Sequence, residues 1–354
     1  MPSKTSELTI KYLDIPNLTE QEWDDLIALR IANTQEASPD DPVNSYESIR
    51  KMITGYPDYN EYIWFWVAYD ANDNCVAMMQ VVHPKPDNPD YEANKKLMWC
   101  WLFVTQDRRR QGIATQLLPL VMQQAQKFGA TIIQSGTSIK SGHQFMEMLE
   151  MQKAFDEKVN RVAIKDIDWD LMAQWMDAGR TRNPEVELIR YDHLPPEKDM
   201  DVYCQLVTDL VRMVPLEDME KEEYTLLPEE LRKQYTRFDE LGRKNIVFVA
   251  RDTDGAMMGM TEMFHDPEKP TLGYVGLTAV LKNYQGRGIG KYLKARMTYD
   301  IRDNFPAVES ISTDNASSNA PMLSINERMG FTVHKHWIAY KIAVSDLANT
   351  INND

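Results

Sequence analysis

The stretch "NYQGRGIGKYL", residues Asn283–Leu293, places three glycines where a helix is expected to begin. The apolar segment Gly273–Val280 precedes it and predicts a strand. Beyond the glycines, apolar residues recur every four positions, which indicates a helix with one buried face: Ile289, Leu293, Met297 and Ile301. The stretch therefore predicts a strand, a glycine-bearing loop and a helix, in that order.

A similar pattern occurs earlier in the chain. The segment "RRRQGIATQL", Arg108–Leu117, follows the apolar segment Leu97–Val104, and in both halves two further predicted strands flank a polar turn. Two segments of the halves align without internal gaps. In the first, Asp70 matches Asp252 and His83 matches His265, 182 positions apart; in the second, Val104 matches Val280 and Gly112 matches Gly288, 176 positions apart. A repeat at such a long period indicates duplicated domains rather than a solenoid.

The length of 354 residues also favours two domains, because a single compact core rarely grows to that size. The polar segment Met176–Leu188, which contains Gly179 and Pro184, marks the expected boundary between them. The predicted domains are therefore residues 1–180 and 185–354.

The composition is that of a globular protein, with 43% hydrophobic and 26% charged residues. No apolar run approaches the roughly 18 residues needed to span a bilayer, and the first residues lack the apolar region of a secretory signal. The net charge of −15 disfavours a nucleic acid or an anionic membrane as partner. The few cysteines predict neither a disulfide framework nor a zinc cluster and favour the cytoplasm: Cys75, Cys100 and Cys204.

The glycine-bearing loops carry the main functional signal. A helix N-terminus presents main-chain N–H groups that the helix leaves unpaired, and glycines let phosphate oxygens approach them. The spacing matches neither the P-loop pattern G-x-x-x-x-G-K-[ST] nor the dinucleotide pattern G-x-G-x-x-G. It does match Q/R-x-x-G-x-G/A, as Gln285–Gly290 in the second half and Arg109–Ala114 in the first. We therefore expect a phosphate-bearing ligand, with a purely structural turn as the alternative.

With this pattern the chain resembles the GNAT acyltransferase superfamily, whose members use the loop to hold the pyrophosphate of acetyl-coenzyme A. The segment "STDNASSNAPMLSINERMGF", Ser312–Phe331, is similar to the family's next strand and helix and ends in its customary Gly-Phe. The resemblance covers nearly the whole second half and, more faintly, the first; tandem arrangements of this kind occur in mycothiol synthase and related acetyltransferases. It implies an α/β (α+β) fold of two GNAT-like domains, each a twisted, mostly antiparallel mixed sheet flanked by helices.

The resemblance also implies a set of contacts to acetyl-coenzyme A. In the second half these fall on the strand end, which would offer main-chain N–H groups to the thioester oxygen, on the loop, and on one downstream asparagine: Thr278, Ala279, Val280, Gln285, Gly286, Arg287, Gly288, Ile289, Gly290, Lys291 and Asn319. In the first half they fall on the matching loop: Arg109, Arg110, Gln111, Gly112, Ile113 and Ala114. No metal ligand is implied.

The first half departs from the family pattern beyond its loop. Leu149–Met151 stands where the second half has Met329–Phe331, and the first half has no counterpart of Asn319. We therefore expect the first domain to be structural or to bind the cofactor only, and the second to be catalytic.

Acyl transfer to an amine requires a group that takes a proton from the amine. Glu262 is the candidate base, acting directly or through water, because the first half has Gln80 at the matching place; a solvated strand glutamate is the alternative. The tyrosine that many family members use as general acid is replaced by Asn326. Solvent could protonate the leaving thiolate instead, and the other candidates are Tyr292 and Tyr340.

The sequence thus predicts a cytoplasmic GNAT-type N-acetyltransferase that uses acetyl-coenzyme A and acetylates a small amine in its second domain. The acidic run Glu217–Glu223 is a candidate lining of the acceptor pocket, with a solvated helix face as the alternative. Two other functions stay open. The absent tyrosine is compatible with a non-catalytic acyl-CoA-binding sensor, and the acceptor side has no signature that would separate a small amine from a peptide or protein.

Overall fold

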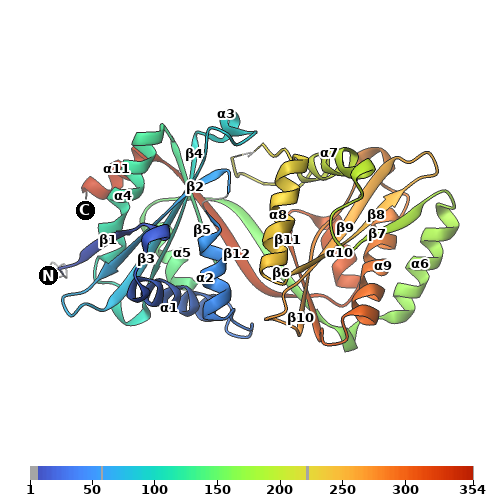
Figure 1. Cartoon of the computed structure of the whole chain (residues 1–354), viewed down its shortest axis with the longest axis horizontal. Helices are drawn as coiled ribbons and strands as arrows, with labels where there is room; N and C mark the ends of the chain where they lie inside the picture. Colours follow the sequence, from blue (N-terminus) through green and yellow to red (C-terminus); the bar gives the residue numbers. More distant parts are fainter. Residues whose placement is uncertain (1–6, 57–58, 221–222, 354) are drawn as a thin grey trace. The chain divides into compact units, whose positions relative to one another are not determined.

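The computed structural model describes residues 7–56, 59–220 and 223–353, which form two compact units (Figure 1). Unit 1 comprises Met1–Phe155, Asp218–Glu222 and Trp337–Asp354, and unit 2 comprises Asp156–Glu217 and Glu223–His336. Each unit is a mixed, mostly antiparallel sheet flanked by helices, so the predicted fold class is confirmed.

In unit 1 the strands follow the order β1-β2-β3-β4-β5-β12, and only the β4–β5 pair is parallel. Their bounds are β1 Thr9–Leu13, β2 Glu61–Tyr69, β3 Cys75–Pro84, β4 Leu97–Val104, β5 Ile132–Thr137 and β12 Thr332–Ala343. Side chains alternate between the two faces, so that Phe65 and Val67 pack under one helical layer while Trp66 and Ala68 pack under the other. The first layer is α1 (Glu20–Ala37) and α2 (Tyr46–Thr54), and the second is α4 (Ile113–Phe128), α5 (Lys140–Met148) and α11 (Val344–Asn353).

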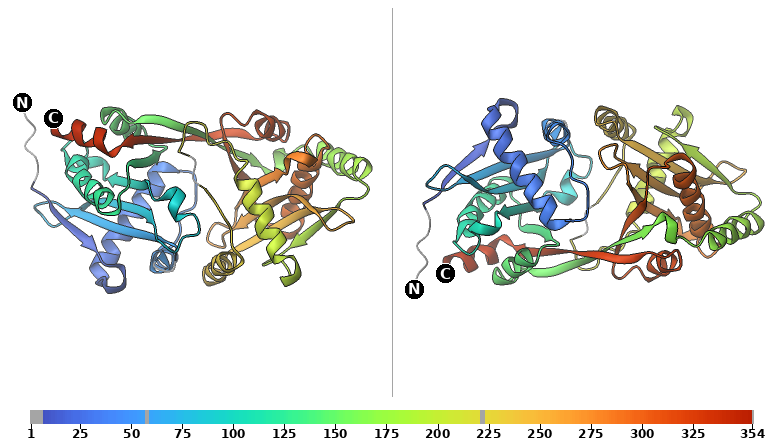
Figure 2. Two further views of the ribbon diagram at one scale, coloured as in Figure 1. Left: turned by 90° about the horizontal axis from the view of Figure 1, so that it is seen from above. Right: turned by 90° about the horizontal axis from the view of Figure 1, so that it is seen from below.

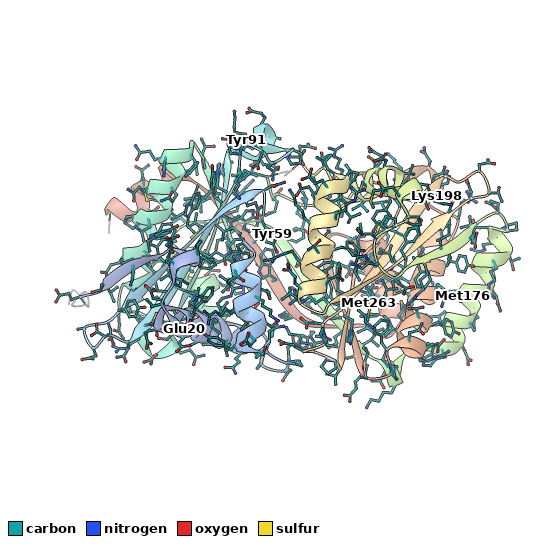
Figure 3. All side chains as sticks on the ribbon, viewed as in Figure 1. Glu20, Tyr59, Tyr91, Met176, Lys198 and Met263 are labelled. Carbon is teal, nitrogen blue, oxygen red and sulfur yellow. The ribbon has the colours of Figure 1, made fainter. Side chains whose placement is uncertain are left out.

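Unit 2 repeats this architecture in the order β6-β11-β10-β9-β8-β7, with β10–β11 as its parallel pair. Its strands are β6 Gln152–Ala163, β7 Glu187–Tyr191, β8 Lys244–Arg251, β9 Met257–His265, β10 Leu272–Val280 and β11 Ser310–Ala316. Helices α7 (Met200–Val211) and α8 (Pro228–Glu240) cover one face. The other face carries α6 (Trp169–Arg182), α9 (Ile289–Asn304) and α10 (Ala320–Arg328). Figure 3 labels two core residues of that face, Met176 on α6 and Met263 on β9.

The last strand of each sheet comes from the other half of the sequence. In β12, Ile338–Ala343 pair with Ile132–Thr137 of β5 and complete unit 1. In β6, Glu157–Ala163 pair with Ser310–Ala316 of β11 and complete unit 2. The two exchanged strands are the long green and red ones in Figure 2.

Because of this exchange, the two compact units have different bounds from the predicted domains, residues 1–180 and 185–354. Residues 156–180 belong to unit 2 and residues 337–354 belong to unit 1. The expected boundary, Met176–Leu188, lies within unit 2, because α6 continues to Arg182 and buries Trp175 and Met176 in that unit's core.

Two further expectations concern membranes and cysteines. None of the helices in the described part of the chain is long and apolar enough to cross a bilayer. Cys75, Cys100 and Cys204 are free thiols, and burial raises the pKa of each, so none is a thiolate near neutral pH. Within the described ranges, no group of three or more acidic, histidine or cysteine residues is arranged to hold a metal ion.

Candidate active site

The loop after β10 exposes main-chain N–H groups. Gly288 caps α9 with a φ of +85°, Gly286 has a φ of +79°, and no described side chain caps this helix. Both glycines occupy the left-handed region that residues with a Cβ atom rarely adopt. A Cβ atom on Gly286 would meet no heavy atom within 4 Å, so the loop surface is open. The first-turn N–H groups of α9 are therefore available to an anion.

A gap opens between β10 and β11 beside this loop. The two strands pair only from Leu272–Tyr274 to Ser310–Ser312, and no pairing follows in the described structure. The N–H of Leu281 donates to the carbonyl of Met258 on β9 at 2.8 Å. Because main-chain groups alternate in direction along an antiparallel strand, Thr278 and Val280 direct theirs into the gap.

The carbonyl of Val280 agrees with this direction, since it accepts a hydrogen bond from Nε2 of Gln285 at 3.0 Å rather than from β9. Of the three strand-end residues expected to contact the thioester, Thr278 and Val280 thus point their N–H groups into the gap. Ala279 pairs toward β9.

A β-bulge lies at the start of the gap. The register between β10 and β9 shifts between Val275 and Thr278, so that Gly276 and Leu277 oppose the single residue Glu262. The N–H of Leu277 leaves the ladder and donates to Oε1 of Glu262 at 3.1 Å. A Cβ atom on Gly276 would lie only 2.9 Å from the same Oε1, so a glycine permits this close approach.

Glu262 sits on the face covered by α7 and α8. Burial raises the pKa of its carboxyl group to about 6, while hydrogen bonds from the Leu277 N–H and the Asn245 side chain act in the opposite direction. Oδ1 of Asn245 in turn accepts a hydrogen bond from the hydroxyl of Tyr235 on α8 at 3.0 Å. The carboxyl group is thereby held beside the bulge in a setting that keeps it ionised only above about pH 6.

Further acidic groups lie on the same face. Tyr274 packs its ring against Phe264, two residues along β9 from Glu262, and donates its hydroxyl to Asp314 at 2.8 Å. Burial raises the pKa of Asp314, and burial together with the nearby Asp314 raises that of Glu157 on β6 to about 7. Oδ1 of Asp314 is buried and has no hydrogen-bond partner among the described residues.

These features agree with the sequence comparison. A family model described as the acetyltransferase (GNAT) family matches residues 23–149 and 213–331. The chain belongs to the GNAT acetyltransferase family. Both units therefore contain a GNAT repeat, and members of this family typically use acetyl-coenzyme A.

Solved GNAT structures share the tandem fold at low sequence identity. A tandem GNAT protein from the clavulanic acid biosynthesis pathway aligns with a TM-score of 0.73 and 17% identity, covering 96% of this chain and 99% of its own. A GCN5-related N-acetyltransferase from Sphaerobacter thermophilus aligns with a TM-score of 0.63 and 15% identity, covering 95% and 96%. No protein with a curated function is significantly similar in sequence.

Several predicted contacts of the second GNAT repeat have structural partners in this conformation. Arg287 donates to Oδ1 of Asn183 at 3.1 Å and pairs with Glu185. The Lys291 ammonium lies 5.8 Å from the Trp175 ring centroid, and Ile289 is buried in the core. Asn319 is the N-cap of α10 and accepts a 3.4 Å hydrogen bond from the N–H of the third residue of that helix.

The position of the missing tyrosine is a buried amide. Asn326 is 1% exposed, and its Nδ2 donates to Oδ1 of Asn315 at 2.6 Å. Its own Oδ1 has no partner among the described residues. Neither substitute tyrosine reaches the bulge: Tyr292 packs against Gly179 of α6, and Tyr340 lies in unit 1, 3.0 Å from a ring nitrogen of His143.

The first GNAT repeat lacks two of these features. Its β3–β4 register runs without a shift from Ala77↔Val104 to Val82↔Trp99, so β4 is one residue shorter than β10 and has no bulge. At the position of Glu262 it has Gln80, which accepts a hydrogen bond from Arg30 at 3.2 Å.

The loop of the first repeat is also tied to its surroundings by side chains. Arg109 bonds to Glu36 of α1 at 2.7 Å and to Ser141 of α5 at 2.9 Å, while Arg110 bonds to Gln144 of α5 at 2.6 Å. In the described part of unit 2, no hydrogen bond or ion pair joins residues 285–290 to the corresponding helix α10. Sequence reasoning could not find these cross-links, because they join residues that are distant along the chain.

The acidic run Glu217–Glu223 does not form one surface. Glu217 accepts hydrogen bonds from main-chain N–H groups of unit 2, whereas Glu220 pairs with Lys96 and Lys341 in unit 1. Residues 221 and 222 of the run lie outside the described residues.

Proposed function

We propose that unit 2 catalyses transfer of an acetyl group from acetyl-coenzyme A to a small amine. The observation that carries this proposal is the β-bulge at Gly276–Leu277, which brings Glu262 beside the gap between β10 and β11 and is absent from unit 1. The carboxyl group with a raised pKa, the strand gap and the open glycine loop follow one another along β10 and the loop after it.

The residues present fit acetyl-coenzyme A. The open surface at Gly286 and the uncapped start of α9 suit its pyrophosphate, with Gln285–Lys291 supplying the main-chain donors. The unpartnered Oδ1 of Asn326, together with Asn319 at the start of α10, suits the amide groups of its pantetheine arm. When bound, acetyl-coenzyme A supplies a thioester that is reactive toward an amine.

Glu262 is the base in this proposal. At pH 7 to 8 its carboxyl group is mostly ionised, because its pKa is about 6, and it can accept the proton of an attacking amine directly or through one water. The N–H groups of Thr278 and Val280 point into the gap, where they can stabilise negative charge on the thioester oxygen.

The acceptor side carries two further carboxyl groups, and Glu157, whose pKa is about 7, is mostly ionised only above that pH. Asp314 and Glu157 lie near Tyr274 on the face that carries Glu262, which favours an amine that binds as a cation and loses its proton only at Glu262. Asn326 carries no acidic proton, so the leaving thiolate is protonated by solvent.

Unit 1 supports the fold of unit 2 in this proposal and does not catalyse transfer. Binding of the cofactor by Arg109–Ala114 stays a prediction, and the contacts of Arg109 and Arg110 with α1 and α5 argue against it. A likeness to mycothiol synthase and a cytoplasmic location also stay predictions. The bulge and Glu262 favour a catalyst over the acyl-CoA sensor, and the acidic face favours a small cationic amine over a peptide or protein.

The test begins with calorimetric titration of acetyl-coenzyme A into the wild type, Gly288→Glu and the matched variant Gly112→Glu. Gly288→Glu places a carboxylate where the pyrophosphate is proposed to bind, so we expect one site in the wild type, none in Gly288→Glu and one in Gly112→Glu. Release of coenzyme A is then measured with a panel of small amines. No binding to the wild type would exclude the acyltransferase, and binding without amine-dependent release from any amine or peptide would favour the sensor.

A further inference from the structure

Helix α6 ends against the proposed phosphate loop. Gly179 of α6 packs on Tyr292 of α9 so closely that an added Cβ atom would overlap the tyrosine ring. Asn183 follows the helix and is fully buried. Its Nδ2 donates to the carbonyl oxygens of Gly179 at 3.1 Å and Arg287 at 3.3 Å, and its Oδ1 accepts from Nε of Arg287 at 3.1 Å. The last turn of α6 and the loop are therefore held together.

This attachment brings Arg182 to the loop. Arg182 is the last residue of α6 and is exposed, and its Nη1 lies 3.8 Å from the place of a Cβ atom on Gly288. Among the described residues, the side chain of Arg182 forms no hydrogen bond or ion pair. The other loop cations are engaged, because Arg287 pairs with Glu185 and Lys291 lies over Trp175. The unpaired guanidinium group of Arg182 thus lies beside Gly288, the N-cap residue of α9.

We propose that Arg182 binds the pyrophosphate of acetyl-coenzyme A together with the loop. This inference rests on the proposed function, and it adds a ligand-binding residue from α6, which precedes the second family match at residues 213–331. A guanidinium donates up to five hydrogen bonds in a plane and matches phosphate oxygens in pairs, whereas the loop itself offers single N–H donors. The fixed end of α6 reduces the conformational freedom that Arg182 loses on binding.

The place of Arg182 beside the loop predicts a contact with the pyrophosphate rather than with the 3′-phosphate of the cofactor. The first-turn N–H groups of α9 define where the pyrophosphate lies, and Gly288 is the N-cap of that turn. A residue beside Gly288 therefore contacts the group common to coenzyme A and dephospho-coenzyme A, which lacks the 3′-phosphate.

The test compares Arg182→Ala, Arg182→Lys and the control Arg180→Ala in the full-length protein. Arg180 is also exposed on α6 but lies two residues away, on a different side of the helix. Dissociation constants are measured by calorimetry for coenzyme A and dephospho-coenzyme A, at low salt and at 0.5 M NaCl. Circular dichroism and thermal unfolding establish that each variant is folded.

We expect Arg182→Ala to raise the dissociation constants of both ligands by about tenfold at low salt, because the charge-assisted hydrogen bonds of one guanidinium are lost. The loss should shrink at high salt, Arg182→Lys should recover part of the affinity, and Arg180→Ala should bind like the wild type. Equal affinities for the wild type and Arg182→Ala would overturn the inference, and so would a loss confined to coenzyme A, which would move the contact to the 3′-phosphate. If the wild type binds neither ligand, the proposed function fails; if it binds both, only the role of Arg182 is at issue.

Discussion

The replacement of Glu262 by Gln tests the proposed chemistry most directly. Gln keeps the shape of the side chain and an oxygen that can accept the 3.1 Å hydrogen bond from the Leu277 N–H, but it cannot take a proton. Loss of a general base typically lowers kcat by about 10²- to 10⁴-fold. At pH 7.5, where a carboxyl group of pKa about 6 is mostly ionised, we expect a loss of about 10²-fold or more.

The size of this loss should depend on pH. At pH 5 only about a tenth of Glu262 is ionised in the wild type, so the kcat of the wild type falls by about tenfold. The ratio of the wild-type kcat to the variant kcat therefore falls by the same factor. The assay measures coenzyme A release with one amine from pH 5 to 8.5, so that titration of the amine cancels in the ratio. The affinity for coenzyme A should not change, and Gln80→Ala in unit 1 should leave kcat unchanged. A ratio that is constant across this range, or below about threefold at pH 7.5, would show that Glu262 is not the base.

Two further predictions concern stability. Gly288→Ala should cost about 1 kcal/mol in the free energy of unfolding, because the φ of +85° is unfavourable for alanine while the nearest atom to the new Cβ lies 3.8 Å away. Gly112→Ala, at a φ of +75°, should cost the same. A much larger loss of stability in urea titrations would indicate a steric clash instead. The raised pKa of Glu157 means that folding favours its protonated form, so the wild type should lose stability as pH rises from about 4.5 through about 7. Glu157→Gln should therefore have a free energy of unfolding about 1–2 kcal/mol above that of the wild type at pH 8, and no advantage at pH 4.5. An equal difference at both pH values would show that the raised pKa of Glu157 is not its cause.

Local patterns in the sequence were enough to predict the repeated strand–loop–helix units. The recurrence of Ile289 and Leu293 every four residues is a property of one helix, and the φ values of Gly286 and Gly288 explain why glycine stands there. The exchange of β6 and β12 could not be predicted in this way. Both strands are 12 residues long, and nothing within either one specifies which edge it pairs with.

The candidate site was predicted in outline but not in its contacts. Comparison of the repeats singled out Glu262 over Gln80. The structure adds that Glu262 lies opposite a bulge in β10, which the residue spacing did not reveal. The Tyr274–Asp314 pair and the approach of Arg182 to Gly288 join residues separated by 40 or more positions. Such contacts depend on tertiary packing, which residue spacing does not encode.

The exchanged strand β12 also determines when unit 1 can finish folding during protein synthesis. A growing chain emerges from the ribosome with its N-terminal part first, and N-terminal domains usually fold before later ones are made. Here unit 1 cannot complete its sheet until Ile338–Ala343 have been translated, so the edge of β5 stays unpaired throughout that time. An open strand edge is a site of mispairing with other chains. Expression of residues 1–180 alone would leave the same edge exposed, and unit 1 can be obtained whole only from a chain that retains its C-terminal strand.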